Sequence, residues 1–214
     1  MNLVLYYAPV ACSLVPYVTL TEAGAPFEVR PVNMGKRQQM SADYLKVNPK
    51  HKVPVLVIDG EPLSENVAIQ QWIHRNYPAA KLLPADPMKE LKAISLMAWC
   101  ASGIHPYLGI INTPTRVCDV AGTDESVKRL SAGLVYETFK IADDLLAGRD
   151  WFFDHFTAAD AHFFWCFRRG MQLKLDLAPY KNCQAHSERM QKRPSVQKVL
   201  AFEKETQEAF AKAA

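Results

Sequence analysis

The sequence predicts a mixed α/β domain followed by an all-helical domain. Over the first 78 residues, short β-prone segments alternate with helical patterns in the order β-α-β-α-β-β-α. A stretch rich in proline and alanine follows, and beyond it the apolar residues recur with a helical period. We therefore expect domains at 1–78 and 88–214, joined by a linker at 79–87. The order in the first domain is that of a thioredoxin-like fold.

The elements of the first domain are bounded by residues that favour turns and caps. Gly24 ends the first helical pattern, Asp59-Gly60 is a hairpin signal, and Ser41 is a candidate N-cap. The expected strands are Asn2–Tyr7, Pro26–Val32, Val53–Ile58 and Glu61–Leu63. The expected helices are Ser13–Ala23, Ser41–Val47 and one that begins at Ser64 and ends near Tyr77.

The second domain is expected to contain long amphipathic helices and no strand. Its helical patterns are Met88–Ile111, with interruptions at Gly103 and Pro106, then Asp124–Ala147, Thr157–Gly170, Ala178–Lys192 and Ser195–Ala211. Thr157 and Asp160 form a variant of the capping box, so we assign them a structural role rather than a catalytic one. The aromatic run around Phe163 spans more than one helix face, which favours the core over a substrate pocket.

Composition excludes several classes of protein. The chain has 25 basic and 22 acidic residues and a formal charge of +3, too balanced to indicate nucleic-acid binding. The apolar N-terminus contains Pro9 and Pro16, and it has neither the pattern of a signal peptide nor that of a membrane span. Five widely spaced cysteines and no metal-ligand spacing argue against disulfides and against a metal site, so we expect a cytoplasmic protein.

Three short motifs are candidates for chemistry, and the first is Val53-Pro54. A proline in an apolar β-run removes a hydrogen-bond donor from the ladder. If the bond is cis, as is typical at this place in a thioredoxin-like sheet, Val53 offers its main chain to an extended peptide. If it is trans, Pro54 is an edge-strand proline, and the motif favours neither reading.

The second motif is Ser64-Glu65-Asn66, at the expected start of a helix. The helix dipole and the first N–H groups favour an anion there, so Asn66 could hold a carboxylate and Glu65 an ammonium group. Plain capping by Ser64 explains the same residues and is favoured on this motif alone.

The third motif is Cys12-Ser13, before the first expected helix. A helix N-terminus can lower the pKa of a cysteine well below its free value of about 8.5. Cys12 is then a reactive thiol or a hydrogen-bond donor, and Ser13 is a cap or a second donor. The thiols of Cys100, Cys118, Cys166 and Cys183 are expected to be buried and inert.

Together these motifs resemble the glutathione transferase family, over essentially the whole chain. The stretch LYYAPVACSLVPYVTLTEAG is most similar to the bacterial beta class, which carries a cysteine just before its first helix. The Val53-Pro54 step, the Ser64-Glu65 step and the Thr157–Asp160 box match the family's signature positions, although Asn66 stands where Ser, Ala or Gly is usual.

The resemblance implies roles for individual residues. Cys12, with Ser13 and His105, would face the sulfur of glutathione. Val53, next to Pro54, would pair with its cysteinyl backbone, Glu65 and Asn66 would hold its γ-glutamyl end, and Lys36 or Lys52 would meet its glycyl carboxylate. An apolar acceptor pocket would include Val10, Tyr107, Ile110 and Ile111.

The function implied is conjugation of the glutathione thiol to small hydrophobic electrophiles by a cytoplasmic, detoxifying homodimer. Two alternatives stay open: a glutathione-dependent thiol reductase that forms a mixed disulfide at Cys12, and a binding module without catalysis. Because Ser13-Leu14-Val15 follows Cys12, a reductase would need a second glutathione to resolve the mixed disulfide.

Overall fold

The computed structural model describes residues 1–212 and contains two compact units. The first consists of Met1–Leu83 and the chain from Lys192 onward, and the second is Pro84–Gln191. The chain passes from the first unit to the second between Leu83 and Pro84, which lies within the expected linker. The last helix, however, groups with the N-terminal unit, whereas the sequence pattern placed it in the helical domain. Helical periodicity identifies an apolar face but not the unit on which that face packs.

The first unit is built on a four-stranded sheet of order β2-β1-β3-β4. Its strands are β1 (Leu3–Tyr7), β2 (Glu28–Pro31), β3 (Val55–Ile58) and β4 (Glu61–Ser64). Strand β1 pairs parallel with β2 and antiparallel with β3, and β3 pairs antiparallel with β4. The thioredoxin-like prediction is confirmed, although β3 starts after Pro54 rather than at Val53.

Helices cover both faces of this sheet. Those of the first unit are α1 (Leu14–Glu22), α2 (Ala42–Val47), α3 (Asn66–Asn76) and α9 (Pro194–Lys212), with short 3-10 turns at Gln38–Met40 and Pro78–Ala80. Neighbouring side chains on a strand point to opposite faces. On β1, Tyr7 contacts Tyr17 of α1 whereas Tyr6 contacts Tyr44 of α2, so α1 and α2 lie on opposite sides.

Over its described length, the second unit contains helices joined by loops and no strand, as expected. Its helices are α4 (Pro87–Trp99), α5 (His105–Asn112), α6 (Asp124–Leu145), α7 (Ala158–Gln172) and α8 (Lys181–Gln191), with a 3-10 turn at Pro114–Arg116. The aromatic run of α7 is buried, with Phe163 and Phe167 packed on Phe139 of α6. The prediction that this run is core is confirmed.

Helices α4 and α5 are joined by a π-helical turn at Cys100–Ile104, where the sequence predicts an interruption. A side chain at Gly103 would meet the Trp99 indole 2.7 Å from its Cβ, so only glycine fits beneath that ring. The stretch Pro87–Asn112 is long and apolar enough to pass a membrane-span test, which core helices of soluble proteins also pass.

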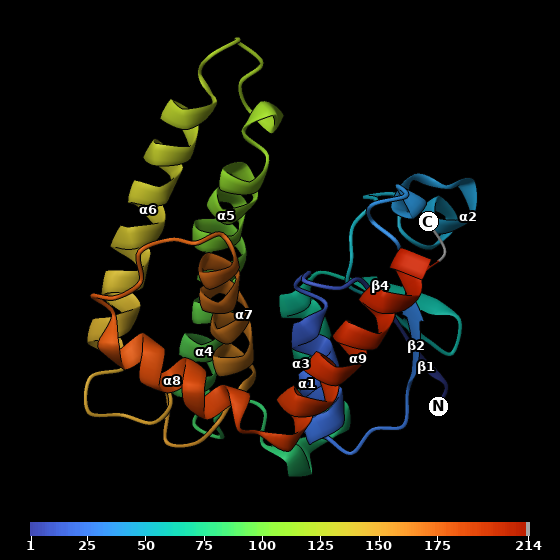
Figure 1. The fold of residues 1–214 in the computed structure, drawn as a ribbon. Helices are drawn as coiled ribbons and strands as arrows, with labels where there is room; N and C mark the ends of the chain where they lie inside the picture. Colours follow the sequence, from blue (N-terminus) through green and yellow to red (C-terminus); the bar gives the residue numbers. More distant parts are fainter. Residues whose placement is uncertain (213–214) are drawn as a thin grey trace. The chain divides into compact units, whose positions relative to one another are not determined.

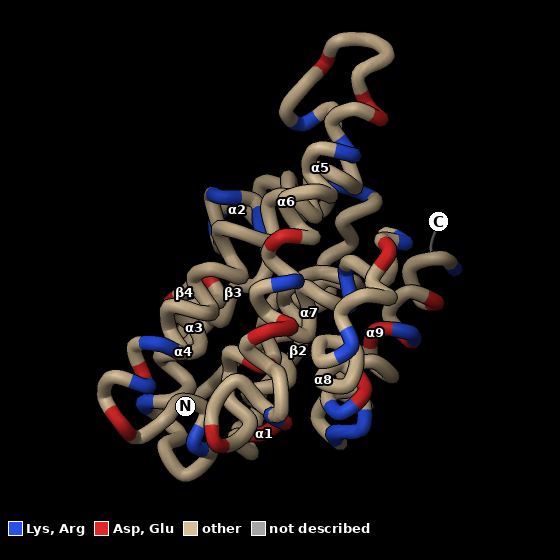
Figure 2. Tube along the Cα trace, turned by 90° about the vertical axis from the view of Figure 1, so that its left-hand side faces the viewer, with Lys and Arg blue, Asp and Glu red and all other residues tan. Residues whose placement is uncertain are grey.

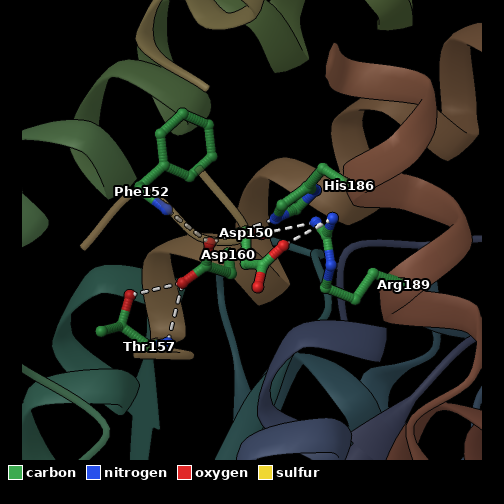
Figure 3. A network of polar contacts seen from close by, with 6 residues as sticks. All are labelled: Asp150, Phe152, Thr157, Asp160, His186 and Arg189. Carbon is green, nitrogen blue, oxygen red and sulfur yellow. Dashed lines mark hydrogen bonds and ion pairs between the residues drawn. The ribbon is translucent and has the colours of Figure 1, made fainter. Parts of the chain in front are cut away.

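The capping box predicted at the start of α7 is confirmed. Asp160 Oδ2 accepts hydrogen bonds from the Thr157 backbone N–H (2.8 Å) and hydroxyl (2.9 Å). The other oxygen, Oδ1, accepts from the Phe152 N–H at 3.0 Å and lies 3.1 Å from His186 Nε2. Figure 3 shows these residues around Asp160. Nearby, Arg189 bonds both the backbone and the carboxylate of Asp150. The box therefore also ties α7 to α8 and to the preceding loop.

Charged residues of both signs alternate along the chain. Figure 2 shows Lys and Arg interspersed with Asp and Glu in both units. Many of them form exposed pairs, such as Lys46–Asp43 and Lys140–Asp144. This distribution agrees with the balanced composition.

Candidate active site

Cys12 lies in the loop between β1 and α1, two residues before the helix begins. Its side chain is buried, and Sγ donates a hydrogen bond to the Val53 carbonyl oxygen at 3.5 Å. Burial raises the pKa of Cys12 to about 12, and the nearby Glu65 charge adds to that rise. A backbone hydrogen bond at Cys12 and, more weakly, Asn66 and Lys52 act in the opposite direction. The expected lowering of this pKa is not found, because desolvation outweighs these contacts.

Ser13 is turned away from the position expected of a second sulfur ligand. It is fully buried, its hydroxyl donates to the Ala8 carbonyl at 3.1 Å and it accepts from the Ala8 N–H at 3.0 Å. The hydroxyl therefore closes the β1–α1 loop instead of capping α1. Both its donor and an acceptor lone pair are used within the loop.

The Val53-Pro54 peptide bond is cis. Both residues are buried, and they immediately precede β3. The adjacent Lys52 carbonyl accepts hydrogen bonds from the Tyr44 hydroxyl (2.7 Å) and the Asn48 amide (2.8 Å). These two contacts fix the backbone on the N-terminal side of the cis bond, next to the Cys12 thiol.

Glu65 and Asn66 form the start of α3, and Glu65 rather than Ser64 is the residue before the helix. Glu65 has φ 74°, a left-handed value that is uncommon outside glycine and clusters at functional sites. Its carboxylate pairs with Lys50 at 2.8 Å, a contact the sequence analysis did not anticipate. Such a surface pair, between a loop and a helix start, has no signature in the sequence.

Asn66 connects α3 to the cysteine loop. It is buried, and its Nδ2 donates to the Cys12 carbonyl oxygen at 3.1 Å. Its Oδ1 is a buried atom without a hydrogen-bond partner among the described residues. The bulk of Asn, unusual at this position, is thus used to hold the Cys12 backbone.

The two lysines expected near a glycyl carboxylate lie in exposed loops. Lys36 follows β2, and its backbone N–H donates to Asn33 Oδ1 at 3.0 Å. Lys52 lies next to Val53 and contributes a favourable charge to the Cys12 thiolate. The structure therefore brings Lys52 into the Cys12 surroundings.

His105 belongs to the helical unit, where it follows the π-helical turn and begins α5. Its ring is half-buried and meets the edge of Trp165 with centroids 4.3 Å apart. Of the apolar side chains expected to line an acceptor pocket, Tyr107 and Ile110 are half-buried and Ile111 is buried. Ile111 is therefore part of the helical core.

Within the first unit, then, Cys12, Val53 and Asn66 meet directly, and Glu65 and Lys52 adjoin them. A buried cysteine beside a cis-proline step defines a thiol site on a thioredoxin-like domain.

Comparison with known proteins agrees with this class. Residues 1–75 match the family model described as "Glutathione S-transferase, N-terminal domain". Glutathione S-transferase GstA of Escherichia coli O157:H7 is 32% identical over 203 residues, covering 93% of this chain and 98% of that protein. The chain belongs to the glutathione transferase family, as the sequence resemblance indicates.

Solved structures of bacterial relatives point to the same family. A sphingomonad glutathione S-transferase complexed with glutathione is 31% identical, with a TM-score of 0.82 over 94% of this chain and 98% of that one. A beta-class enzyme of Sphingomonas chungbukensis is 30% identical, with the same TM-score and coverage. Another relative, maleylpyruvate isomerase of a Ralstonia species, is 30% identical over 76% of this chain and 79% of its own.

Proposed function

We propose that this protein binds glutathione in its first unit and joins the glutathione thiol to small hydrophobic electrophiles. The observation that carries the proposal is the buried Cys12 thiol at the Val53 carbonyl and the start of α3. In the reaction, the glutathione sulfur forms a bond to the electrophilic carbon. The leaving group departs with the bonding electron pair, and the thiol proton goes to solvent.

The protonation state of Cys12 favours one of the two roles open to it. A thiol whose pKa is about 12 is protonated at neutral pH and can donate a hydrogen bond. With glutathione bound, Cys12 would donate to the glutathione thiolate rather than to Val53, and so favour ionisation of that sulfur. A mixed disulfide would instead require the Cys12 thiolate.

The other ligand contacts follow from the residues nearby. Val53 would pair with the cysteinyl backbone of the peptide through its main chain, beside Pro54. Glu65 and Asn66 would hold the γ-glutamyl end, and Lys52 or Lys36 would meet the glycyl carboxylate. His105 of the helical unit is a further candidate for the thiol chemistry, on the family resemblance alone. Ser13 would act indirectly, by closing the loop.

The test is turnover of a generic aryl halide with glutathione by the wild type, Cys12→Ala and Cys183→Ala. A hydrogen bond to a charged group contributes about 1.5–3 kcal/mol, so loss of the Cys12 donor to the developing thiolate should lower kcat of Cys12→Ala about 10- to 100-fold. Cys183 is a buried thiol of the helical unit, and its variant should keep the wild-type rate per folded molecule. A wild type that neither turns over the substrates nor stays on immobilised glutathione contradicts the proposal.

The two earlier alternatives have their own readouts. Mass spectrometry after incubation with oxidised glutathione would show an adduct at Cys12 if the protein is a thiol reductase. Retention on immobilised glutathione with no turnover of any substrate would favour a binding module.

A second candidate activity is suggested by the relatives that are maleylpyruvate or maleylacetoacetate isomerases. Their substrates are dianions, which would require cationic side chains at the acceptor site. The α5 side chains expected there, Tyr107 and Ile110, are aromatic and aliphatic, which favours conjugation. Isomerisation of maleylpyruvate, followed by absorbance, would decide between the two.

We further propose that the protein is a homodimer in the cytoplasm with a role in detoxification. Large apolar side chains are exposed on one stripe of α6 and on α4, namely Leu130, Leu134, Ile141, Leu145, Met88 and Leu91. Ile141 and Leu145 line a groove of about 970 Å³ with Leu96 and Trp99. Such a surface suits burial against a second copy. Light scattering of the wild type and Leu134→Glu tests the dimer.

Five free cysteines suit a reducing compartment.

A further inference from the structure

The loop that carries Cys12 is held by a residue almost two hundred positions away. Glu203 of α9 is 4% exposed, and its Oε2 accepts a hydrogen bond from the Val10 backbone N–H at 2.7 Å. The same oxygen accepts from the Tyr7 hydroxyl at 3.3 Å. Carboxylates are rarely buried unless they are hydrogen-bonded, so these contacts account for the burial of Glu203.

The Val10 backbone requires such a contact. Val10 has φ 68°, in the left-handed region that a β-branched residue seldom occupies. That conformation costs roughly 1–2 kcal/mol relative to the right-handed one. A charge-assisted hydrogen bond from its own N–H can offset much of this cost. Because Val10 lies two residues before Cys12, its conformation sets the path of the loop that carries the thiol.

Helix α9 is a firm support for this contact. Arg193 pairs with both carboxylate oxygens of Glu22 in α1 at 3.0 and 2.7 Å, and Ser195 bonds the same carboxylate. Further along α9, the Phe202 ring packs on Tyr7 and Tyr17 with centroids 5.6 and 5.5 Å apart. Figure 1 shows α9 running beside α1.

We propose that Glu203 is a positioning residue for the active-site loop, acting on Cys12 through the left-handed backbone of Val10. The effect on catalysis rests on the proposed glutathione transferase function, whereas the effect on the loop does not. A corollary is that the glutathione-binding unit is discontinuous and needs α9 for an ordered site.

The test compares Glu203→Ala, Glu203→Gln and Glu208→Ala with the wild type. Glu208 is an exposed carboxylate of the same helix and is the matched control. Glu203→Ala should lower kcat about 10-fold and raise KM for glutathione less than about 3-fold, because Val53, Glu65 and Asn66 still hold the peptide. Glu203→Gln keeps an acceptor oxygen, so its kcat should lie between those of Glu203→Ala and the wild type.

The decisive measurement is rescue by Val10→Gly. Glycine adopts φ 68° without strain, so its loop should no longer need the carboxylate. Whatever Val10→Gly alone does to kcat, the loss caused by Glu203→Ala should be about half as large on a logarithmic scale in the Val10→Gly background as in the wild-type background. If the Glu203 variants lose only stability, keep wild-type kcat per folded molecule and show no coupling to Val10, the proposal is overturned.

A readout that needs no glutathione separates this proposal from the proposed function. Iodoacetamide alkylation of Cys12 at pH 8 should be about 10-fold faster in Glu203→Ala, because a displaced loop exposes the thiol, and Val10→Gly should reverse this. An inactive wild type with these alkylation rates would contradict the transferase function alone. Unchanged alkylation in a folded Glu203→Ala or Glu203→Gln protein would contradict the positioning role.

Discussion

The starts of α1 and α7 are held by different kinds of contact. At α7, Thr157 and Asp160 bond each other across three positions, and the contacts of Asp160 with Phe152 and His186 span 8 and 26 positions. At α1, Cys12 reaches Val53 across 41 positions, and the loop before it is held by Glu203 across 193. The α7 start is a local structural device, whereas the α1 start is assembled from three distant segments. The difference separates a helix start that stabilises a fold from one that positions a reactive group.

The largest expected effect is at α7. Asp160→Ala would leave the Thr157 and Phe152 N–H groups and the His186 ring without their acceptor, and should lower the free energy of unfolding by about 3–5 kcal/mol. The matched control is Asp86→Ala, which removes an exposed N-cap at α4 and should cost about 1 kcal/mol. Urea unfolding measures both, and equal losses would refute the distinction between a buried cluster and a simple cap.

At the start of α1 the expected effect is on reactivity. Because burial raises the pKa of Cys12 to about 12, its alkylation at pH 7–9 should be at least about 100-fold slower than that of Cys118. The expectation that Cys118 is buried and inert is wrong: it is half-buried, and a hydrogen bond to Thr123 lowers the pKa of its thiol. Peptide mapping after timed alkylation measures both rates.

The raised pKa of Cys12 also makes the stability of the protein depend on pH. The stabilisation from a neutral, buried Cys12 is fully present below its usual pKa of 9.0 and is lost as the pH rises towards 12. Alkaline unfolding of Cys12→Ala should therefore lack this component. Faster alkylation of Cys12 than of Cys118 would contradict the raised pKa of Cys12, and with it both the slow alkylation and the alkaline loss of stability expected from it.

A moderate effect is expected within α7, at His162, two residues beyond Asp160. His162 is fully buried, and neither ring nitrogen has a hydrogen-bond partner among the residues described. Desolvation lowers the pKa of His162 to about 3. The folded protein therefore keeps its full stability with a neutral His162 above pH 6.5, and loses part of it as the pH falls towards 3. His162→Phe should change stability at pH 7 by less than about 2 kcal/mol, since it removes an unpaired polar group.

Acid unfolding measures the second part of that prediction. The His162→Phe protein should keep more of its stability between pH 6.5 and pH 4 than the wild type does. A steeper acid transition in the variant would show that His162 is protonated in the folded protein.

The smallest effect is expected at the start of α3. Lys50→Gln breaks an ion pair whose side chains are 53% and 65% exposed, and should change the free energy of unfolding by less than about 1 kcal/mol. Lys46→Gln, which breaks the exposed pair with Asp43, is the matched control. If Lys50→Gln raises KM for glutathione and Lys46→Gln does not, the Lys50 pair orients Glu65 towards the ligand. If both variants keep near-wild-type KM values, the Lys50 pair has no role in ligand binding.

Prediction from sequence succeeded where contacts are local. The alternation of strands and helices, the Thr157–Asp160 box and the Ser41 cap of α2 follow from neighbouring residues, and the structure has all of them. It failed at Ser13, at the α3 cap and at the unit joined by α9. At α3 and α9 the outcome depends on distant partners, Lys50 and the Cys12 loop for α3 and α1 for α9. At Ser13 the partner is Ala8, five residues away, in a loop that has no periodic pattern to predict it.

The sequence by itself determined the order of elements, the two-part organisation and the family, because periodicity and short motifs are properties of adjacent residues. Only the tertiary structure decided the protonation of Cys12, the contact of Asn66 with the Cys12 carbonyl and the burial of Glu203 against Val10. Desolvation and hydrogen bonding depend on what surrounds a group in space, and these surroundings come from segments far apart in the chain.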